Sequence, residues 1–133
     1  MLDPETLIEE VSGMEELGES VAGSLFPEFI RSLFETGRAM QGRSEIDRRL
    51  PSLDPAISRR TAWVCYRGGV WDLACVLFLR SLEANSNDYK LLSALEAAAR
   101  RCGRVQEVAA AYESLRDRFP HLHGRRRGLL RRP

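Results

Sequence analysis

Residues 69–86 read GVWDLACVLFLRSLEANS, and residues 103–120 read GRVQEVAAAYESLRDRFP. Both stretches open with glycine, and a 34-residue step leads from Gly69 to Gly103. The same step aligns the residues that follow, pairing Trp71 with Val105, Ala74 with Val108, Phe78 with Tyr112, Ser81 with Leu115 and Ser86 with Pro120. A helix–turn–helix unit with a period of about 34 residues is the signature of a helical repeat array. We therefore expect stacked repeats in this half of the chain.

Helical signals extend on both sides of each glycine. Apolar residues recur at three- and four-residue spacing, and the breaks between these runs hold glycine, asparagine, aspartate or proline. The pattern predicts four helices, over Ile57–Gly68, Val70–Ala84, Tyr89–Cys102 and Val105–Phe119. No stretch alternates apolar and polar residues between two turns, so we expect no sheet. The expected fold class is all-α, with antiparallel helix pairs that meet at Gly69 and at Gly103.

The spacing of small and aromatic residues resembles the tetratricopeptide-repeat (TPR) family over roughly residues 55–120. The positions that carry the likeness are Ala62, Gly69, Trp71, Ala74, Phe78 and Ser81 in one unit and Gly103, Tyr112 and Pro120 in the next. The sequence departs from the family pattern at Glu96, where a small residue is expected, and at Val108, which replaces alanine. The resemblance implies helix pairs stacked as a short superhelix, in which small residues permit close approach. The residues it places in the core are Ala74, Phe78, Leu95 and Tyr112. An unrelated helical bundle is the alternative.

The rest of the chain completes a three-part organisation. We expect residues 1–26 to form an acidic amphipathic segment, because Asp3-Pro4-Glu5 is a helix-start signal and apolar residues follow at helical spacing. A second segment begins at Phe26-Pro27 and runs to Gln41-Gly42, and a shorter helix covers Ser44 to Leu50. We interpret residues 27–55 as a third, shortened unit, with Gly37 as its small position and Pro55 as its terminator. Residues 27–120 then form the repeat domain, and residues 121–133 a basic C-terminal tail or capping helix.

Composition limits the class of protein. The chain has 133 residues, of which 44% are hydrophobic and 29% charged, a balance typical of a globular domain. Its longest apolar run, Leu73–Leu79, is far shorter than the roughly 20 residues that span a bilayer. The first residues lack the basic and apolar regions of a secretory signal. The three cysteines are an odd number without a C-x-x-C pair, so we expect a reducing, cytoplasmic location.

The net charge of +1 hides a strong asymmetry along the chain. Residues 1–50 carry 11 acidic and five basic side chains, whereas residues 51–133 carry eight acidic and 15 basic ones. The first 30 residues contain eight acids and no lysine or arginine, and residues 121–133 contain five arginines and no acid. Such a division favours an acidic arm next to a basic body.

Signals for catalysis, metals and cofactors are weak. His121 and His123 lie two residues apart, but no cysteine or acid close in sequence completes a zinc site. The cysteines fall in apolar helical stretches, where cysteine is usually a buried filler. The glycines lack the context of a phosphate-binding loop. We therefore expect no enzyme, no metal and no cofactor.

If the TPR register holds, one face of the repeats is basic and aromatic. The residues predicted to bind a partner are Arg59, Arg60, Trp63, Tyr66 and Arg67 on one helix and Lys90, Arg100 and Arg101 on the next, beside Ser93, Ala94 and Ala97. Such a groove suits an acidic or amphipathic helix, either of a partner protein or of residues 1–30 of this chain. The alternative is that Trp63 or Tyr66 packs inward, as aromatic residues in helices often do.

Three classes of function are compatible with this pattern. The favoured one is a protein–protein interaction module: a small adaptor, chaperone or complex subunit, similar in size to the TPR-fold chaperones of type III secretion subunits. The alternative is a pentatricopeptide-like protein whose C-terminal arginines, Arg125–Arg127 and Arg131-Arg132, contact RNA phosphates. Against it stand the near-zero net charge and the lack of a continuous basic stripe. The third class is a subunit that is stable only inside a complex.

Overall fold

The computed structural model of the protein describes residues 25–131. Within this range the chain is helical and contains no strand, which confirms the all-α class. The helices are α3 (Phe26–Glu35), α4 (Ala39–Arg49), α5 (Pro55–Arg67), α6 (Trp71–Ser81), α7 (Tyr89–Cys102), α8 (Val105–Leu115) and α9 (His121–Arg131). Two short 3₁₀ turns, η1 (Leu50–Ser52) and η2 (Glu83–Asn85), follow α4 and α6. The expected segment 1–26 lies almost wholly outside the described residues.

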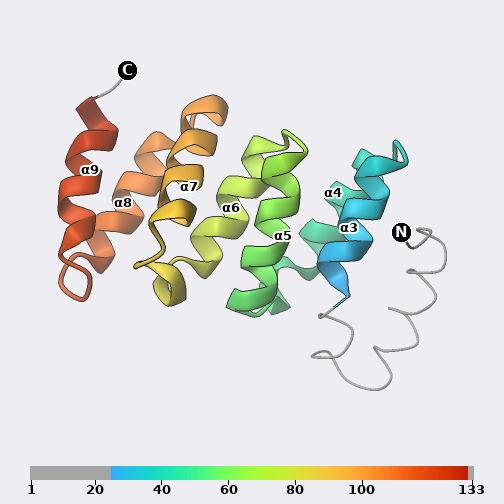
Figure 1. Ribbon diagram of the computed structural model, residues 1–133, viewed down its shortest axis with the longest axis horizontal. Coiled ribbons are helices and arrows are strands. Elements are labelled where there is room, and N and C mark those ends of the chain that lie inside the picture. The colour runs from blue at the N-terminus through green and yellow to red at the C-terminus, as the bar shows by residue number, and fades with distance from the viewer. Residues whose placement is uncertain (1–24, 132–133) are drawn as a thin grey trace.

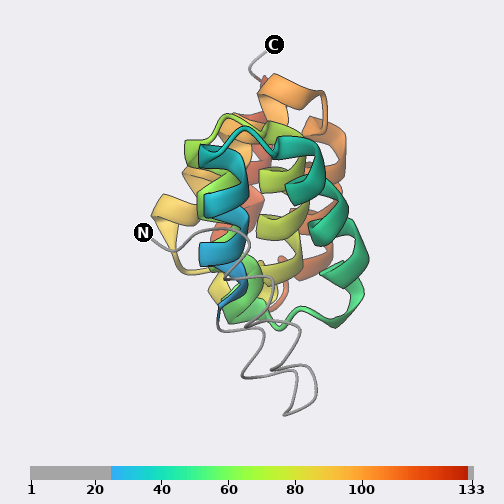
Figure 2. The ribbon, with the colours of Figure 1, turned by 90° about the vertical axis from the view of Figure 1, so that its right-hand side faces the viewer.

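The helices form two layers. Helices α3, α5 and α7 lie side by side in one layer, and α4, α6 and α8 form the other (Figures 1 and 2). Each helix of the first layer is followed along the chain by its neighbour in the second, so the repeating element is an antiparallel pair. Helix α9 closes the array and packs against α8. None of the helices in the described part of the chain is both long enough and apolar enough to span a membrane.

The three pairs share one turn. Gly37, Gly69 and Gly103 have φ angles of 77°, 75° and 75°, a left-handed conformation that favours glycine. In each turn the N–H of the residue after the glycine donates to the carbonyl four residues before the glycine. These bonds are Arg38 to Leu33 at 2.7 Å, Val70 to Cys65 at 2.9 Å and Arg104 to Ala99 at 2.9 Å. The expected breaks at Gly69 and Gly103 are thus confirmed.

The first pair differs from the expectation. Gly37 is the turn glycine of this pair, not a small position inside a helix, and the break falls there rather than at Gln41-Gly42. The predicted short helix Ser44–Leu50 is the second half of α4, which begins at Ala39. Gly42 lies inside α4, where a Cβ would come within 2.8 Å of the Phe34 ring of α3. The absence of a side chain here makes room for the Phe34 ring against α4.

Pro55 also has a different role from the one expected. It is the first residue of α5, a position where the missing N–H of proline costs nothing. Asp54 caps this helix, because its carboxylate accepts from the N–H of Ile57 at 2.9 Å. Asp88 caps α7 in the same way through the N–H of Leu91 at 3.1 Å. Each cap marks the start of a new pair.

The core lies between the two layers. The residues five positions after the turn glycines, Gly42, Ala74 and Val108, are buried, as are those nine positions after them, Ile46, Phe78 and Tyr112. The predicted core residues Ala74, Phe78, Leu95 and Tyr112 are all wholly buried, which confirms that expectation. The same geometry therefore recurs three times, although the step from Gly37 to Gly69 is two residues shorter than the step from Gly69 to Gly103.

Candidate protein-binding face

Four aromatic rings pack together between α5 and α6. The Trp63 ring lies 5.0 Å from Phe78 and 5.6 Å from Tyr66, and Tyr66 lies 5.4 Å from Trp71, all in edge-to-face geometry. Phe78 is wholly buried, whereas Trp63 and Tyr66 are only partly exposed. The two rings expected in an open groove thus pack inward against α6, and each contributes only part of its surface to the outside.

Two predicted binding arginines lie over rings of this cluster. The Arg67 guanidinium is 5.9 Å from the centre of the Trp63 ring, and that of Arg101 is 4.3 Å from Trp71. Attraction between a cation and the face of a ring holds the side chains there. Arg101 thereby joins α7 to α6 across the boundary between two pairs.

The other expected cations on α5 have partners within the fold. Arg59 donates to Asn85 at 3.3 Å, and Arg60 forms an ion pair with Glu28 of α3 at 2.6 Å. Lys90, on α7, is exposed. Ala94 was expected on the same face but is buried, so it contributes to the core instead.

A cleft of about 380 Å³ separates α7 from α9. The residues that line it are Ser93, Glu96, Arg100, Arg125, Gly128 and Leu129. Arg100 is among the residues predicted to bind a partner, and Ser93 was predicted beside it on the same face. A second cleft, of about 210 Å³, lies between α3 and α5, and its lining is Arg31, Phe34, Glu35, Val64, Arg67 and Gly68. Arg67 and Arg100 thus each line a cleft between neighbouring helices of one face.

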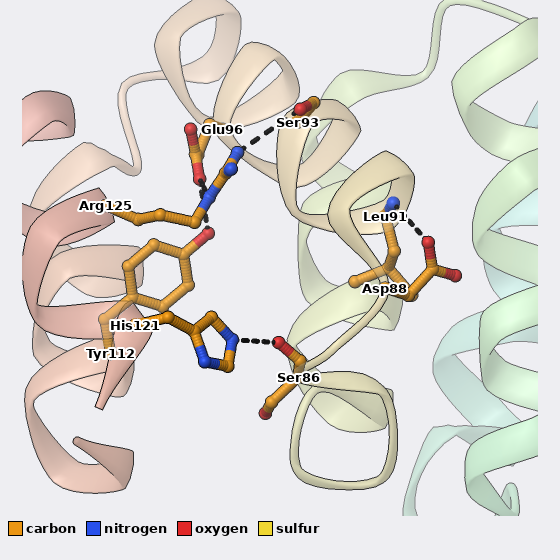
Figure 3. Close-up of polar contacts among 8 residues, drawn as sticks. All are labelled: Ser86, Asp88, Leu91, Ser93, Glu96, Tyr112, His121 and Arg125. Atoms are coloured by element: carbon orange, nitrogen blue, oxygen red, sulfur yellow. Dashed lines mark hydrogen bonds and ion pairs between the residues drawn. The ribbon is translucent and has the colours of Figure 1, made fainter. Parts of the chain in front are cut away.

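A polar network forms one wall of the α7–α9 cleft (Figure 3). Arg125 donates to Glu96 at 2.7 Å and to Ser93 at 3.2 Å, and the Tyr112 hydroxyl donates to Glu96 at 2.8 Å. Burial and the Glu96 charge raise the pKa of Tyr112, so the hydroxyl keeps its proton and stays a donor. Although burial acts to lower it, the pKa of Arg125 is raised by its hydrogen bond to Glu96 and by the charge of that carboxylate.

His121 fixes the start of α9. Its Nε2 donates to the backbone carbonyl of Ser86 (Figure 3). The centre of its ring lies 5.8 Å from that of Tyr89 and 6.3 Å from that of Phe119. Arg125 lies 6.0 Å from the Tyr89 ring on the same side. Helix α9 is therefore anchored to α7 along its first half, and the α7–α9 cleft has two fixed walls.

Sequence reasoning missed this network, although it held one signal of it. The sequence shows Glu96 as a departure from the repeat pattern. The structure explains the departure, because the Glu96 carboxylate accepts hydrogen bonds from Tyr112 and Arg125. His121 was considered only as a metal ligand. Within residues 25–131 no group of three or more histidine, cysteine, aspartate or glutamate side chains is arranged to hold a metal ion.

The buried thiols are poor nucleophiles. Burial raises the pKa of Cys65 and of Cys75 to about 12, so both stay protonated near neutral pH. Cys102 is partly buried at the end of α7.

The face formed by α3, α5, α7 and α9 therefore offers shape and charge for binding. It has two clefts, the partly exposed Trp63 and Tyr66, and arginines of which several are already paired.

No protein-family model, curated protein or solved structure matches this chain.

Proposed function

We propose that this protein is a TPR-like protein–protein interaction module, an adaptor, chaperone or complex subunit of the cytoplasm, and not an enzyme. It binds an acidic or amphipathic segment of a partner across the face formed by α3, α5, α7 and α9. The observation that carries this proposal is the pair of clefts on that face, each lined by an arginine, Arg67 in one and Arg100 in the other.

The chemistry of the face supports a peptide ligand. Concave sites with partly apolar walls and a few fixed polar groups are the usual form of binding sites. Trp63 and Tyr66 expose part of their rings beside the arginines, which gives the apolar face of an amphipathic helix a surface to cover. Charge then sets orientation and the rate of association, and apolar contact supplies most of the affinity.

RNA binding has less support. Two of the C-terminal arginines are engaged within the fold, because Arg125 pairs with Glu96 and Arg126 lies 3.6 Å from Glu113. Phosphate contacts would have to compete with these pairs, so no observation favours this function over the first.

The test is selection of random linear peptides by the full chain, followed by affinity measurement at low and moderate salt. The double variant Arg67→Gln/Arg100→Gln should bind the selected peptides at least tenfold more weakly, a loss of at least about 1.4 kcal/mol of binding free energy. The matched control Arg48→Gln/Arg116→Gln removes the same charge from the other layer and should bind normally. Equal binding by both variants would show that this face is not the site, and failure of the wild-type chain to select any peptide would refute the proposed function.

A further inference from the structure

Within the described part of the chain, Arg100 is the one charged group of the α7–α9 cleft that the fold leaves unpaired. Of the two other charges there, Arg125 and Glu96 neutralise each other at 2.7 Å. The Arg100 Nε is buried and has no hydrogen-bond partner among residues 25–131. A buried donor without an acceptor loses its hydration and gains nothing in return. The cleft therefore carries one excess positive charge and an unsatisfied donor.

The surroundings define what could pair with the Arg100 charge. The Arg100 side chain as a whole is only partly buried and lines the cleft, and the two terminal Nη groups of a guanidinium form a planar fork that matches the two oxygens of a carboxylate. Leu129, from α9, lies behind the cleft and is only 1% exposed, so recognition here rests on charge and not on apolar contact. Glu96 cannot take this role, because Tyr112 and Arg125 already occupy its carboxylate. The site suits an external acid.

We propose that the α7–α9 cleft is a subsite for one aspartate or glutamate side chain of the bound partner segment, with Arg100 as the group that pairs with it. This inference rests on the proposed function and names the feature of the partner that this end of the face recognises. Helix α9 supplies one wall, so the subsite exists only while Arg125 and His121 keep α9 docked on α7.

The experiment uses random linear peptides fused at their C-terminal ends, so that no free terminal carboxylate is presented. Peptides selected by the full wild-type chain should share one acidic residue. Its replacement by the corresponding amide should weaken binding to the wild-type chain about tenfold, which corresponds to about 1.4 kcal/mol and is typical of the loss of one charge-assisted hydrogen bond. The same replacement should change binding to Arg100→Gln by no more than about twofold, because the partner of the acid is then absent.

Three results decide whether the α7–α9 cleft is a subsite for an acidic side chain. The subsite is established if the amide replacement weakens binding to the wild-type and Arg116→Gln chains alike but has little effect on binding to Arg100→Gln. Selected peptides without a shared acid, or an equal loss in the wild-type and Arg100→Gln chains, overturn the inference and leave the proposed function intact. Synthetic peptides with free and amidated C-termini form the last arm, and a preference for the free terminus that depends on Arg100 would overturn the assignment to a side chain. Circular dichroism of each variant verifies the fold.

Discussion

The helix pairs α5/α6 and α7/α8 share one backbone turn but are held together by different chemistry. In α5/α6, the residue seven positions before the turn glycine is Ala62 and the residue nine positions after it is Phe78. The equivalent residues of α7/α8 are Glu96 and Tyr112, whose hydroxyl donates to that carboxylate. One pair therefore buries an apolar ring against small neighbours, and the other buries a phenol together with its acceptor.

The two differences, glutamate for alanine and tyrosine for phenylalanine, depend on each other. A buried hydroxyl without a partner costs free energy, and so does a buried carboxylate without a donor. Tyrosine in place of phenylalanine is therefore compatible with the repeat because glutamate replaces alanine at the facing position. Spacing and the turn fix the geometry of this array, whereas the chemistry at one position can vary if its partner varies with it.

The apolar pair should show the largest loss of stability. Phe78→Ala removes a wholly buried ring that contacts Trp63 and Tyr66, and a deletion of this kind costs about 3–5 kcal/mol. Urea unfolding followed by circular dichroism measures the change. Phe78→Leu, which keeps more of the volume, should cost less. A loss below about 1 kcal/mol in Phe78→Ala would mean that the ring contributes little to the core.

The polar pair should show the next largest loss. Glu96→Ala removes the acceptor of the Tyr112 hydroxyl and the ion-pair partner of Arg125, which keeps only its hydrogen bond to Ser93. We expect a loss of about 3 kcal/mol, at the low end of the range for breaking a buried ion pair, because the side chains of Glu96 and Arg125 are still 13% and 24% exposed. Urea unfolding again gives the value.

A double variant sharpens this comparison. Glu96→Ala/Tyr112→Phe gives α7/α8 the apolar chemistry of α5/α6, so its cost should be smaller than the sum of the two single losses by about 1 kcal/mol. Strict additivity of the two losses would contradict the view that these residues act as a matched pair.

The same contrast explains what the sequence could predict. Gly69 and Gly103 were recognisable because both units keep the 34-residue step and both have an aromatic residue nine positions after the glycine. The turn of the first pair was missed because the step from Gly37 to Gly69 is two residues shorter, and Ile46 takes the place of the aromatic residue. A shortened step shifts every equivalent position, so a search at one fixed period cannot find it.

The binding face was less predictable than the fold. Helical periodicity places Trp63, Tyr66 and Arg101 on their helices, but it does not show that the rings pack on α6 or that Arg101 lies over Trp71. The partner of Glu96 is 29 residues away in α9, and sequence spacing carries no information about such a contact. Long-range pairing of charges depends on the docking of α9, which only the structure reveals.

A smaller effect should be confined to one end of the array. Arg125→Gln removes the ion pair with Glu96 but leaves the turn and the core of α5/α6 unchanged, so α9 should open more often than the rest of the molecule. Hydrogen exchange measured by mass spectrometry should be about ten times faster over residues 121–131, which corresponds to about 1.4 kcal/mol. Arg127→Gln, an exposed change on the same helix, is the control. Equal acceleration in α5 and α6 would indicate global destabilisation instead.

The smallest effect belongs to an ion pair near the surface, between Arg43 of α4 and Asp72 of α6. Two hydrogen bonds, of 2.7 and 3.2 Å, join these side chains, which are 37% and 39% exposed. The hydrogen bond from Arg43 holds the pKa of Asp72 below its usual range. The pair therefore stabilises the fold above the unfolded-state pKa of about 3.9, and this contribution disappears as the pH falls through the lower folded-state pKa.

Asp72→Asn should cost no more than about 1 kcal/mol at neutral pH, because solvent screens an exposed pair far more than the enclosed Glu96–Arg125 pair. Unfolding free energies measured between pH 7 and pH 2 should converge for the wild type and Asp72→Asn at the acidic end, since the wild-type carboxylate is protonated there. Asp117, which is 99% exposed, provides the control substitution Asp117→Asn, for which no such convergence is expected. A difference between wild type and Asp72→Asn that stays constant down to pH 2 would show that Asp72 acts through packing and not through its charge. In that case exposure would not be what separates the two ion pairs, and the strength of the Glu96 network would have to come from the Tyr112 hydrogen bond.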